Sequence, residues 1–225
     1  MTTSAISSHG EFRVTASDRA PGLNLPQKMG RALWAPMLLM GVMAYPAAVV
    51  LGAIRANLVA NGTTTSDAAT AAALGQYTTA VMFLGFASIF AAIVFAIARI
   101  LGAFRTGGGG VQQASGRRVL TLAMPPTAKA MVGLMMMGMM MLLFAVVVHV
   151  ILGINVSAAV LSSDAASVTT IQSWSTWIEG VRRLGVAVYL VSIALGLATI
   201  VQVLRFQAAR IRELPEERQI SGSTS

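Results

Sequence analysis

The residues with the clearest capacity for chemistry are seven methionines in one apolar run, residues 130–152. They are Met131, Met135, Met136, Met137, Met139, Met140 and Met141. Thioethers are soft ligands, so methionines four residues apart on a helix could pass Cu(I) along it. Consecutive methionines point all round a helix, however, and the chain has no cysteine and two histidines. We therefore interpret them as flexible filler among helices and lipid, with a methionine-lined apolar site as an alternative, and expect no metal.

One ionisable residue, His149, lies in the same run. An ionisable side chain within a membrane span is a functional hypothesis by default, and imidazole is a common axial ligand of haem iron. Ligation by two histidines would need a second one, and the chain's other histidine, His9, lies in a polar N-terminal segment. His149 is also near the end of its run, where a neutral imidazole can hydrogen-bond a carbonyl group or interfacial water. We favour this structural role, expect no cofactor, and keep haem or quinone binding at His149 as the alternative.

Two further patterns resemble functional sites, but a structural role explains each of them better. Four consecutive glycines, residues 107–110, could suggest a phosphate-binding loop. Such a loop needs a strand before it and a Lys-Ser or Lys-Thr pair after it, so we predict a flexible linker instead. Glu179 precedes Arg182 and Arg183 by three and four residues, which is the spacing of a solvated ion pair on a helix. Because no nucleophile–base pair is apparent, we expect no catalytic residue and no enzyme.

Four apolar runs must position these residues. They cover residues 33–54, 79–101, 130–152 and 184–204, in a chain that is 56% hydrophobic and 11% charged, with a mean hydropathy of +0.73. About 20 apolar residues are long enough to cross a bilayer as a helix. Polar segments, residues 55–77 and 153–170, connect the two runs of each of two pairs and are expected to be outer loops. The sequence predicts an all-α integral membrane protein whose four transmembrane helices form two hairpins.

Basic residues are unevenly distributed about the runs. On the side of the termini lie thirteen: Arg13, Arg19, Lys28, Arg31, Arg99, Arg105, Arg117, Arg118, Lys129, Arg205, Arg210, Arg212 and Arg218. On the other side lie three: Arg55, Arg182 and Arg183. Cytoplasmic segments carry the excess of Lys and Arg, so we predict a cytoplasmic-membrane protein with both termini in the cytoplasm. Four of these residues are expected to contact anionic lipid headgroups: Arg117, Arg118, Arg205 and Arg210.

These observations divide the chain into five segments. They are a polar cytoplasmic N-terminal arm (1–28), a first transmembrane hairpin (29–101), a glycine-rich basic cytoplasmic linker (102–127), a second transmembrane hairpin (128–204) and a polar cytoplasmic tail (205–225). Small residues at helical spacing are expected to let helices pack closely within the hairpins or against other proteins. They are Gly85, Ser88, Ala92, Ala96, Gly138, Ala145, Ser192 and Gly196.

The two halves of the chain share a faint internal similarity. Ser-Asp-Ala-Ala occurs at residues 66–69 and again 97 residues later at 163–166. A Met-Gly pair that ends at Gly41 is followed at the same offset by one that ends at Gly138. If the halves are duplicated, each contains an even number of spans, so they would be parallel tandem repeats about an axis along the membrane normal. The other interpretation is chance similarity, which is common in a sequence of such low complexity.

The function that these patterns favour is structural. We expect a non-catalytic accessory or scaffold subunit of a larger integral-membrane complex, with a packing and lipid-organising role. Its partners would be the lipid bilayer and other integral-membrane subunits. The net charge of +8 does not indicate nucleic-acid binding, because the basic residues flank apolar spans and do not cluster on a soluble domain. The alternatives are the redox anchor at His149 and a small transporter or channel, although the spans carry few buried charges.

Overall fold

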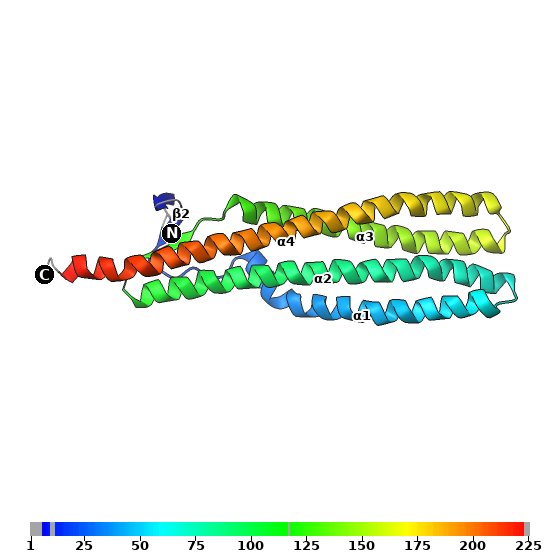
Figure 1. The fold of residues 1–225 in the computed structure, drawn as a ribbon, viewed down its shortest axis with the longest axis horizontal. Helices are drawn as coiled ribbons and strands as arrows, with labels where there is room; N and C mark the ends of the chain where they lie inside the picture. Colours follow the sequence, from blue (N-terminus) through cyan, green and yellow to red (C-terminus); the bar gives the residue numbers. More distant parts are fainter. Residues whose placement is uncertain (1–5, 10–11, 117, 223–225) are drawn as a thin grey trace. The chain divides into compact units, whose positions relative to one another are not determined.

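The architecture is that of a computed structural model, which describes residues 6–9, 12–116 and 118–222 (Figure 1). Four long helices and three short strands are found in these residues. In chain order they are β1 (Ile6–His9), β2 (Phe12–Ser17), α1 (Leu25–Asn61), α2 (Thr65–Ala114), β3 (Val119–Leu122), α3 (Pro126–Leu161) and α4 (Ala165–Gly222).

The prediction of four helices long and apolar enough to cross a membrane is confirmed within the described residues. The helices have 37, 50, 36 and 58 residues. At about 1.5 Å per residue they are about 54–87 Å long, whereas a bilayer core is about 30 Å thick. Each helix is therefore longer than a bilayer crossing requires. The expected outer loops, residues 55–77 and 153–170, are mostly helix, because both are rich in alanine, the strongest helix former.

Two short turns replace these loops, and each ends in a helix cap. Before α2, the Asp67 carboxylate accepts hydrogen bonds from the backbone N–H of Thr63 and of Thr64, and the Thr64 hydroxyl oxygen accepts one from the Asp67 N–H. Before α4, Asp164 itself is the cap, and its carboxylate accepts from the N–H groups of Ala166 and Ser167. Asp67 and Asp164 are equivalent in the proposed repeat, yet they occupy different cap positions. This element gives the repeat no support.

The four glycines at 107–110, expected to be a flexible linker, lie inside α2. A glycine costs a helix about 1 kcal/mol relative to alanine, so tertiary packing must stabilise this stretch. A Cβ atom built on Gly109 would lie 2.9 Å from Pro21 Cδ, and one on Gly108 would meet the end of the Gln207 side chain. The glycines thus let other segments approach the helix closely. The chain leaves α2 through Gly116, whose φ of +70° is in the left-handed region that glycine tolerates.

The chain divides into two compact units. The first unit comprises Met1–Ala32, Val94–Val132 and Ile193–Ser225, and the second comprises Leu33–Ile93 and Gly133–Ser192. Segments distant in sequence therefore come together within each unit.

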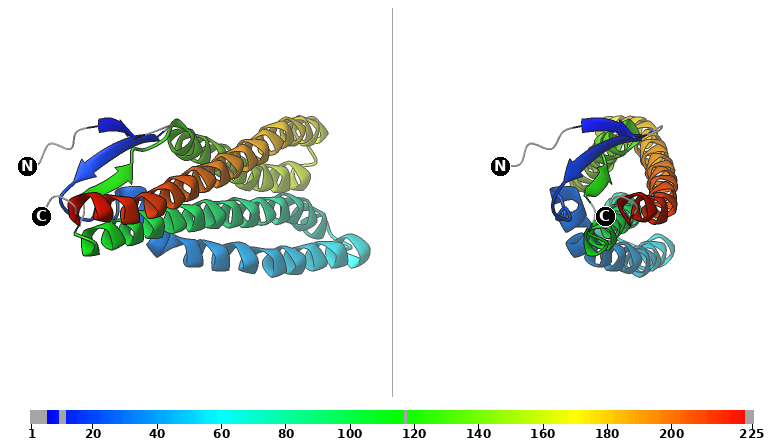
Figure 2. Two further views of the ribbon diagram at one scale, coloured as in Figure 1. Left: turned by 60° about the vertical axis from the view of Figure 1, so that its left-hand side comes forward. Right: turned by 90° about the vertical axis from the view of Figure 1, so that its left-hand side faces the viewer.

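The first unit contains a small sheet that the sequence analysis did not predict. Its strands are antiparallel in the order β1-β2-β3, and Figure 2 shows them side by side. Val14 of β2 and Val119 of β3 are buried, and the Phe12 ring packs edge-on against Phe206 of α4 at 5.6 Å. The buried amide of Gln112 accepts a hydrogen bond from the Leu120 N–H (2.9 Å) and donates one to the Leu120 carbonyl (3.0 Å). Gln112 thereby pairs the edge of β3 that no strand covers.

The second unit is built from helices that approach each other at glycines. A Cβ atom on Gly85 of α2 would lie 3.0 Å from Ala44 Cβ of α1, and one on Gly138 of α3 would lie 2.9 Å from the ring of Tyr189. Such contacts let backbones pack closely where lipid provides no hydrophobic drive. Four more of the predicted packing residues are buried in this unit: Ser88, Ala92, Ala145 and Ser192.

The two remaining packing residues belong to the first unit. A Cβ atom on Gly196 of α4 would lie 2.8 Å from Met131 Sδ and 3.0 Å from a methyl group of Ile97. Ala96 of α2 is half-buried. Seven of the eight residues chosen for small size thus lie at buried positions or at close backbone approaches, and Ala96 is the exception.

Candidate functional site around His149

A polar network in the second unit joins three helices at His149. His149 of α3 is 2% exposed, and its Nδ1 lies 2.8 Å from Oε1 of Gln76 on α2. Its Nε2 lies 3.1 Å from Nη1 of Arg182 on α4. Because an amide oxygen only accepts and a guanidinium only donates, the network assigns the proton to Nδ1 and leaves the Nε2 lone pair to accept from Arg182. His149 is therefore a neutral imidazole with both ring nitrogens bonded.

Arg182 is the charged member of this network. It is 6% exposed, forms an ion pair with Glu179 one turn earlier on α4, and lies 4.0 Å above the centre of the Phe83 ring. Its Nε is buried without a hydrogen-bond partner among the described residues. Removing a cation from water is costly, and here a carboxylate, an aromatic face and an imidazole together offset that cost.

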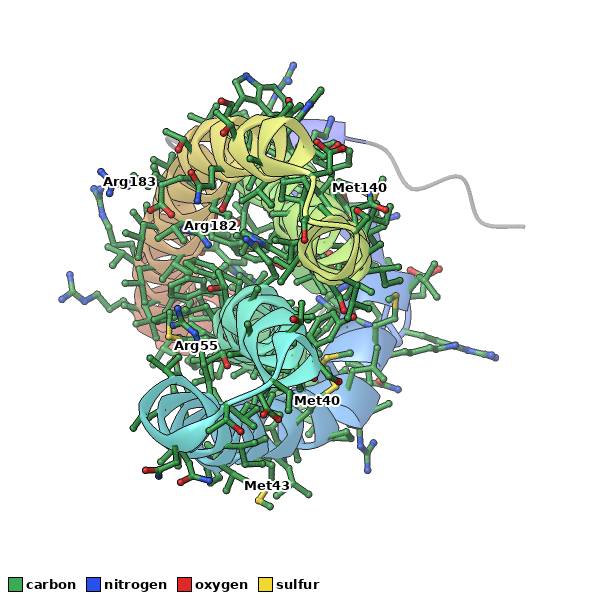
Figure 3. The ribbon with its side chains drawn as sticks, turned by 90° about the vertical axis from the view of Figure 1, so that its right-hand side faces the viewer. Met40, Met43, Arg55, Met140, Arg182 and Arg183 are labelled. Carbon is green, nitrogen blue, oxygen red and sulfur yellow. The ribbon has the colours of Figure 1, made fainter. Side chains whose placement is uncertain are left out.

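The solvated ion pair predicted for Glu179 with one of these two arginines is found at Arg183, whereas Arg182 pairs with the same glutamate from a buried position. Arg183 is exposed and forms the expected solvated ion pair with Glu179 at 2.9 Å. Arg182 points in among the helices, as Figure 3 shows, whereas Arg183 points away from them. The cause is helical geometry, because neighbouring residues are rotated by about 100° and cannot share one face.

The arrangement bears on the possible chemistry of His149. An axial haem ligand donates a nitrogen lone pair to iron, and the Nε2 lone pair here accepts a hydrogen bond from Arg182. Iron binding would displace that arginine from its partner. The network can hold three helices in register. Because the His149 ring bonds both neighbours, a change in its hydrogen bond to Gln76 would alter its hydrogen bond to Arg182.

The methionines of α3 do not gather at this site. Met131 and Met135 are buried, whereas Met136, Met137 and Met140 are between 47% and 64% exposed. Met40 and Met43 of α1 are exposed too. Figure 3 shows Met43 and Met140 on different sides of the helices. In the ranges searched, no three residues of His, Cys, Asp or Glu are grouped as a metal would need.

The four arginines expected at lipid headgroups have different environments. Arg118 is exposed and 3.7 Å from Asp18. Arg205 is exposed beside Arg13 and Lys129, with which it lines a cavity. Arg210 is 2% exposed and forms an ion pair with Glu213 at 2.5 Å, which is the geometry of a structural residue. Arg117 lies outside the described residues.

Charge separates the two units. All thirteen basic residues of the predicted cytoplasmic side belong to the first unit, together with five acidic residues, which gives that unit a net charge of +8. The second unit has three basic and three acidic residues and is neutral. Comparison of the chain with protein-family models, with curated proteins and with solved structures gives no match.

Proposed function

We propose that the chain is a non-catalytic accessory or scaffold subunit of a larger integral-membrane complex, which packs against other membrane proteins and organises anionic lipid. The observation that carries this proposal is the uncovered apolar surface of α1. Its most apolar stretch is 17% buried, against 50% for α2. Leu39, Val49 and Val59 are between 64% and 71% exposed.

The covered side of α1 is a narrow stripe. Gly41 faces Gly85 and Ile89 of α2, and the stripe continues through Ala44 and Ala48, which are buried. A helix held by one neighbour presents the rest of its circumference to lipid or to another membrane protein. A partner helix would add the packing contacts that α1 otherwise lacks.

The proposal includes an arrangement of the chain in the membrane. α1 with α2, and α3 with α4, would form two antiparallel hairpins, since residues 62–64 and 162–164 connect them. The excess of basic residues favours a cytoplasmic location of both termini in the cytoplasmic membrane. A parallel tandem repeat would agree with the offset of 97 residues, although the two aspartates cap their helices differently.

A small transporter is the second candidate, and the His149 network favours it. An arginine and a histidine buried among apolar helices mark a functional site by default. Under this alternative, His149→Gln would abolish transport in liposomes. Under the accessory proposal, it would change only the stability of the helices.

Photo-crosslinking in native membranes tests the accessory proposal. A diazirine-bearing residue at Val49 would face the partner, and the same residue at the adjacent Ala48, which is 7% exposed, would face α2 and serve as the control. We expect one protein adduct of defined mass from position 49, none from position 48, and the same partner in a fixed ratio after gentle solubilisation. Purification of a lone chain that crosslinks only to lipid would overturn the proposal.

A further inference from the structure

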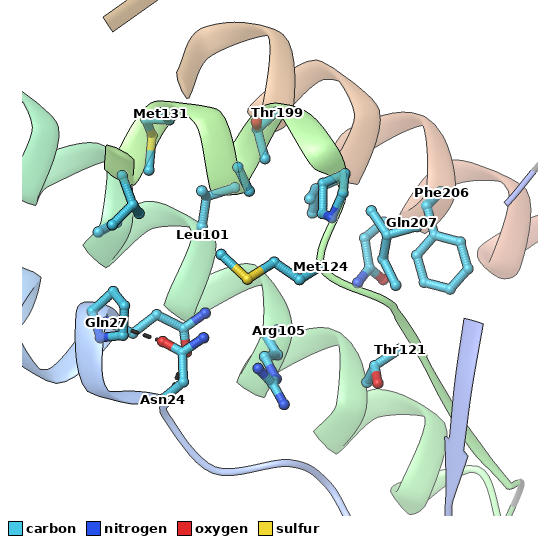
Figure 4. Close-up of a pocket in the computed structure, with 17 residues that line it drawn as sticks. Asn24, Gln27, Leu101, Arg105, Thr121, Met124, Met131, Thr199, Phe206 and Gln207 are labelled. Carbon is cyan, nitrogen blue, oxygen red and sulfur yellow. Dashed lines mark hydrogen bonds between the residues drawn. The ribbon is translucent and has the colours of Figure 1, made fainter. Parts of the chain in front are cut away.

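The first unit contains a partly open cavity of about 120 Å³ (Figure 4). Helices α1 to α4 and the segment after β3 contribute to its lining. Its size is similar to that of an engineered cavity of about 150 Å³ that holds benzene. It can therefore hold a small group or the beginning of an aliphatic chain, but not a whole lipid.

Arg105 is the charged residue among the described residues that line this cavity. Its Nε is buried without a hydrogen-bond partner, and the described part of the chain gives its guanidinium no acidic residue. The two buried arginines differ from half-buried Arg105, since Arg182 pairs with Glu179 and Arg210 with Glu213. Guanidinium has five donors in a fork that matches phosphate oxygens.

The neutral polar groups of the cavity are already bonded. Asn24 and Gln27 cap α1 reciprocally, each accepting from the backbone N–H of the other, as the dashed lines in Figure 4 show. Thr121 donates to the Thr15 carbonyl, and Gln207 donates to the Phe104 carbonyl. Among the described polar side-chain atoms of this lining, Arg105 Nε is the one that is buried without a hydrogen-bond partner.

The cavity crosses the predicted ends of three apolar runs. Ala98, Leu101, Val132 and Val203 lie within those runs, and Arg105 lies four residues past the end of the second. One part of the lining is therefore suited to acyl chain and the adjoining part to an anion at headgroup depth. A phospholipid has this order of chemistry at the edge of a bilayer.

We propose that this cavity is a binding site for an anionic phospholipid, whose phosphate pairs with Arg105 and whose first acyl carbons lie against Leu101, Val132 and Val203. The inference rests on the lipid-organising part of the proposed function and makes it specific to one residue. The remainder of the lipid lies in the bilayer.

Native mass spectrometry of the full chain in neutral detergent tests this site. The probes are dioleoylphosphatidylglycerol, dioleoylphosphatidylcholine and inorganic phosphate. We expect Arg105→Gln to weaken phosphatidylglycerol binding about tenfold and phosphatidylcholine binding less, because the choline cation offsets the charge of the same phosphate. Arg118→Gln removes the same charge from an exposed arginine and should change binding less than about twofold. Val132→Phe, which fills the apolar part, should also weaken binding although it keeps every charge.

Four outcomes would overturn the site. One is equal binding of the two lipids to the unaltered chain, which would also count against the lipid-organising role. The second is an equal loss for Arg105→Gln and Arg118→Gln with a retained preference for phosphatidylglycerol, which would leave that role intact. The third is tight binding of phosphate alone with no effect of Val132→Phe, which would indicate a plain anion site. Arg105→Lys keeps the charge without the fork, so it should retain partial binding if folding is unaffected. The fourth outcome is complete loss of phosphatidylglycerol binding in Arg105→Lys with unchanged thermal unfolding, which would contradict the charge pairing.

Discussion

The two units of this protein differ in net charge and in how their charged side chains are paired. In the second unit each acidic side chain has a partner: Asp67 and Asp164 cap helices, and Glu179 pairs with two arginines. In the first unit basic residues outnumber acidic ones by eight. Because the second unit is neutral, that excess is not neutralised within the chain.

This difference distinguishes charges that stabilise the fold through internal ion pairs from charges that attract ions or molecules from the surroundings. A buried arginine with its carboxylate, as in the second unit, fixes how helices pack and needs no other molecule. An excess of cations repels itself and attracts anions from the surroundings, of which lipid phosphate is the nearest for a membrane protein. Under the proposed function, the excess basic residues of the first unit would bind anions, whereas Arg182 of the second unit stabilises helix packing.

The largest expected effect is all-or-none and concerns orientation. Cysteines introduced at Ser66 and Ser162, in the turn regions of the second unit, should react with an impermeant maleimide applied outside intact cells. A cysteine at Ser115, in the first unit, should react only after lysis, because the basic unit is expected in the cytoplasm. External labelling of position 115 would reverse the assignment and remove the charge argument.

A second prediction breaks the paired charge of the second unit. Glu179→Ala leaves Arg182 buried beside His149 without its carboxylate. It should lower the free energy of unfolding by about 2–3 kcal/mol, less than the roughly 3–5 kcal/mol of a fully buried pair because Glu179 is 36% exposed. Arg183→Ala removes an exposed partner of the same glutamate and should cost less than about 1 kcal/mol. Unfolding in mixed micelles measures both. Equal effects of the two substitutions would mean that the burial of Arg182 adds nothing to the stabilisation that its ion pair with Glu179 provides.

The apolar spans could be predicted because hydropathy over about 20 residues is a local property. The helical extensions could not, since residues 55–77 and 153–170 are polar enough to be loops. The glycine stretch at 107–110 was mistaken for a linker because packing against Pro21, distant in sequence, overrides local propensity. The strands have four to six residues, and their edge is completed by the Gln112 side chain, which no periodicity reveals.

The candidate site was predictable only in part. His149 was conspicuous as an ionisable residue in an apolar run. Its partners are 73 and 33 residues away in sequence, and spacing cannot show contacts between helices. Gln76 was the available signal, because a polar residue in an alanine-rich helical segment needs a partner if it is buried.

A third prediction compares glycines that differ in contact. Gly138→Ala brings a Cβ within 2.9 Å of Tyr189 and should destabilise the second unit by about 1–3 kcal/mol. Gly133→Ala, on the same helix with nothing within 4 Å, should stabilise it by about 0.5–1 kcal/mol. In the first unit, Gly109→Ala and Gly110→Ala form the corresponding pair. Thermal unfolding measures these changes. We expect the two variants of each pair to change the free energy of unfolding in opposite directions.

The smallest expected effect concerns pH and Asp164, which lies in the turn before α4. Hydrogen bonds from the Ser167 hydroxyl and from the Ser167 and Ala166 N–H groups lower the pKa of Asp164 from its usual value of 3.8. The ionised form is favoured in the folded chain, so its stabilising contribution is present above pH 3.8 and disappears as the pH falls through the lowered pKa. Ser167→Ala removes the largest of these interactions and should return the pKa toward 3.8. Carbon-13 NMR of the labelled carboxyl group measures it, with Ser163→Ala as the control. An unchanged pKa in Ser167→Ala would show that the backbone N–H groups alone hold the charge.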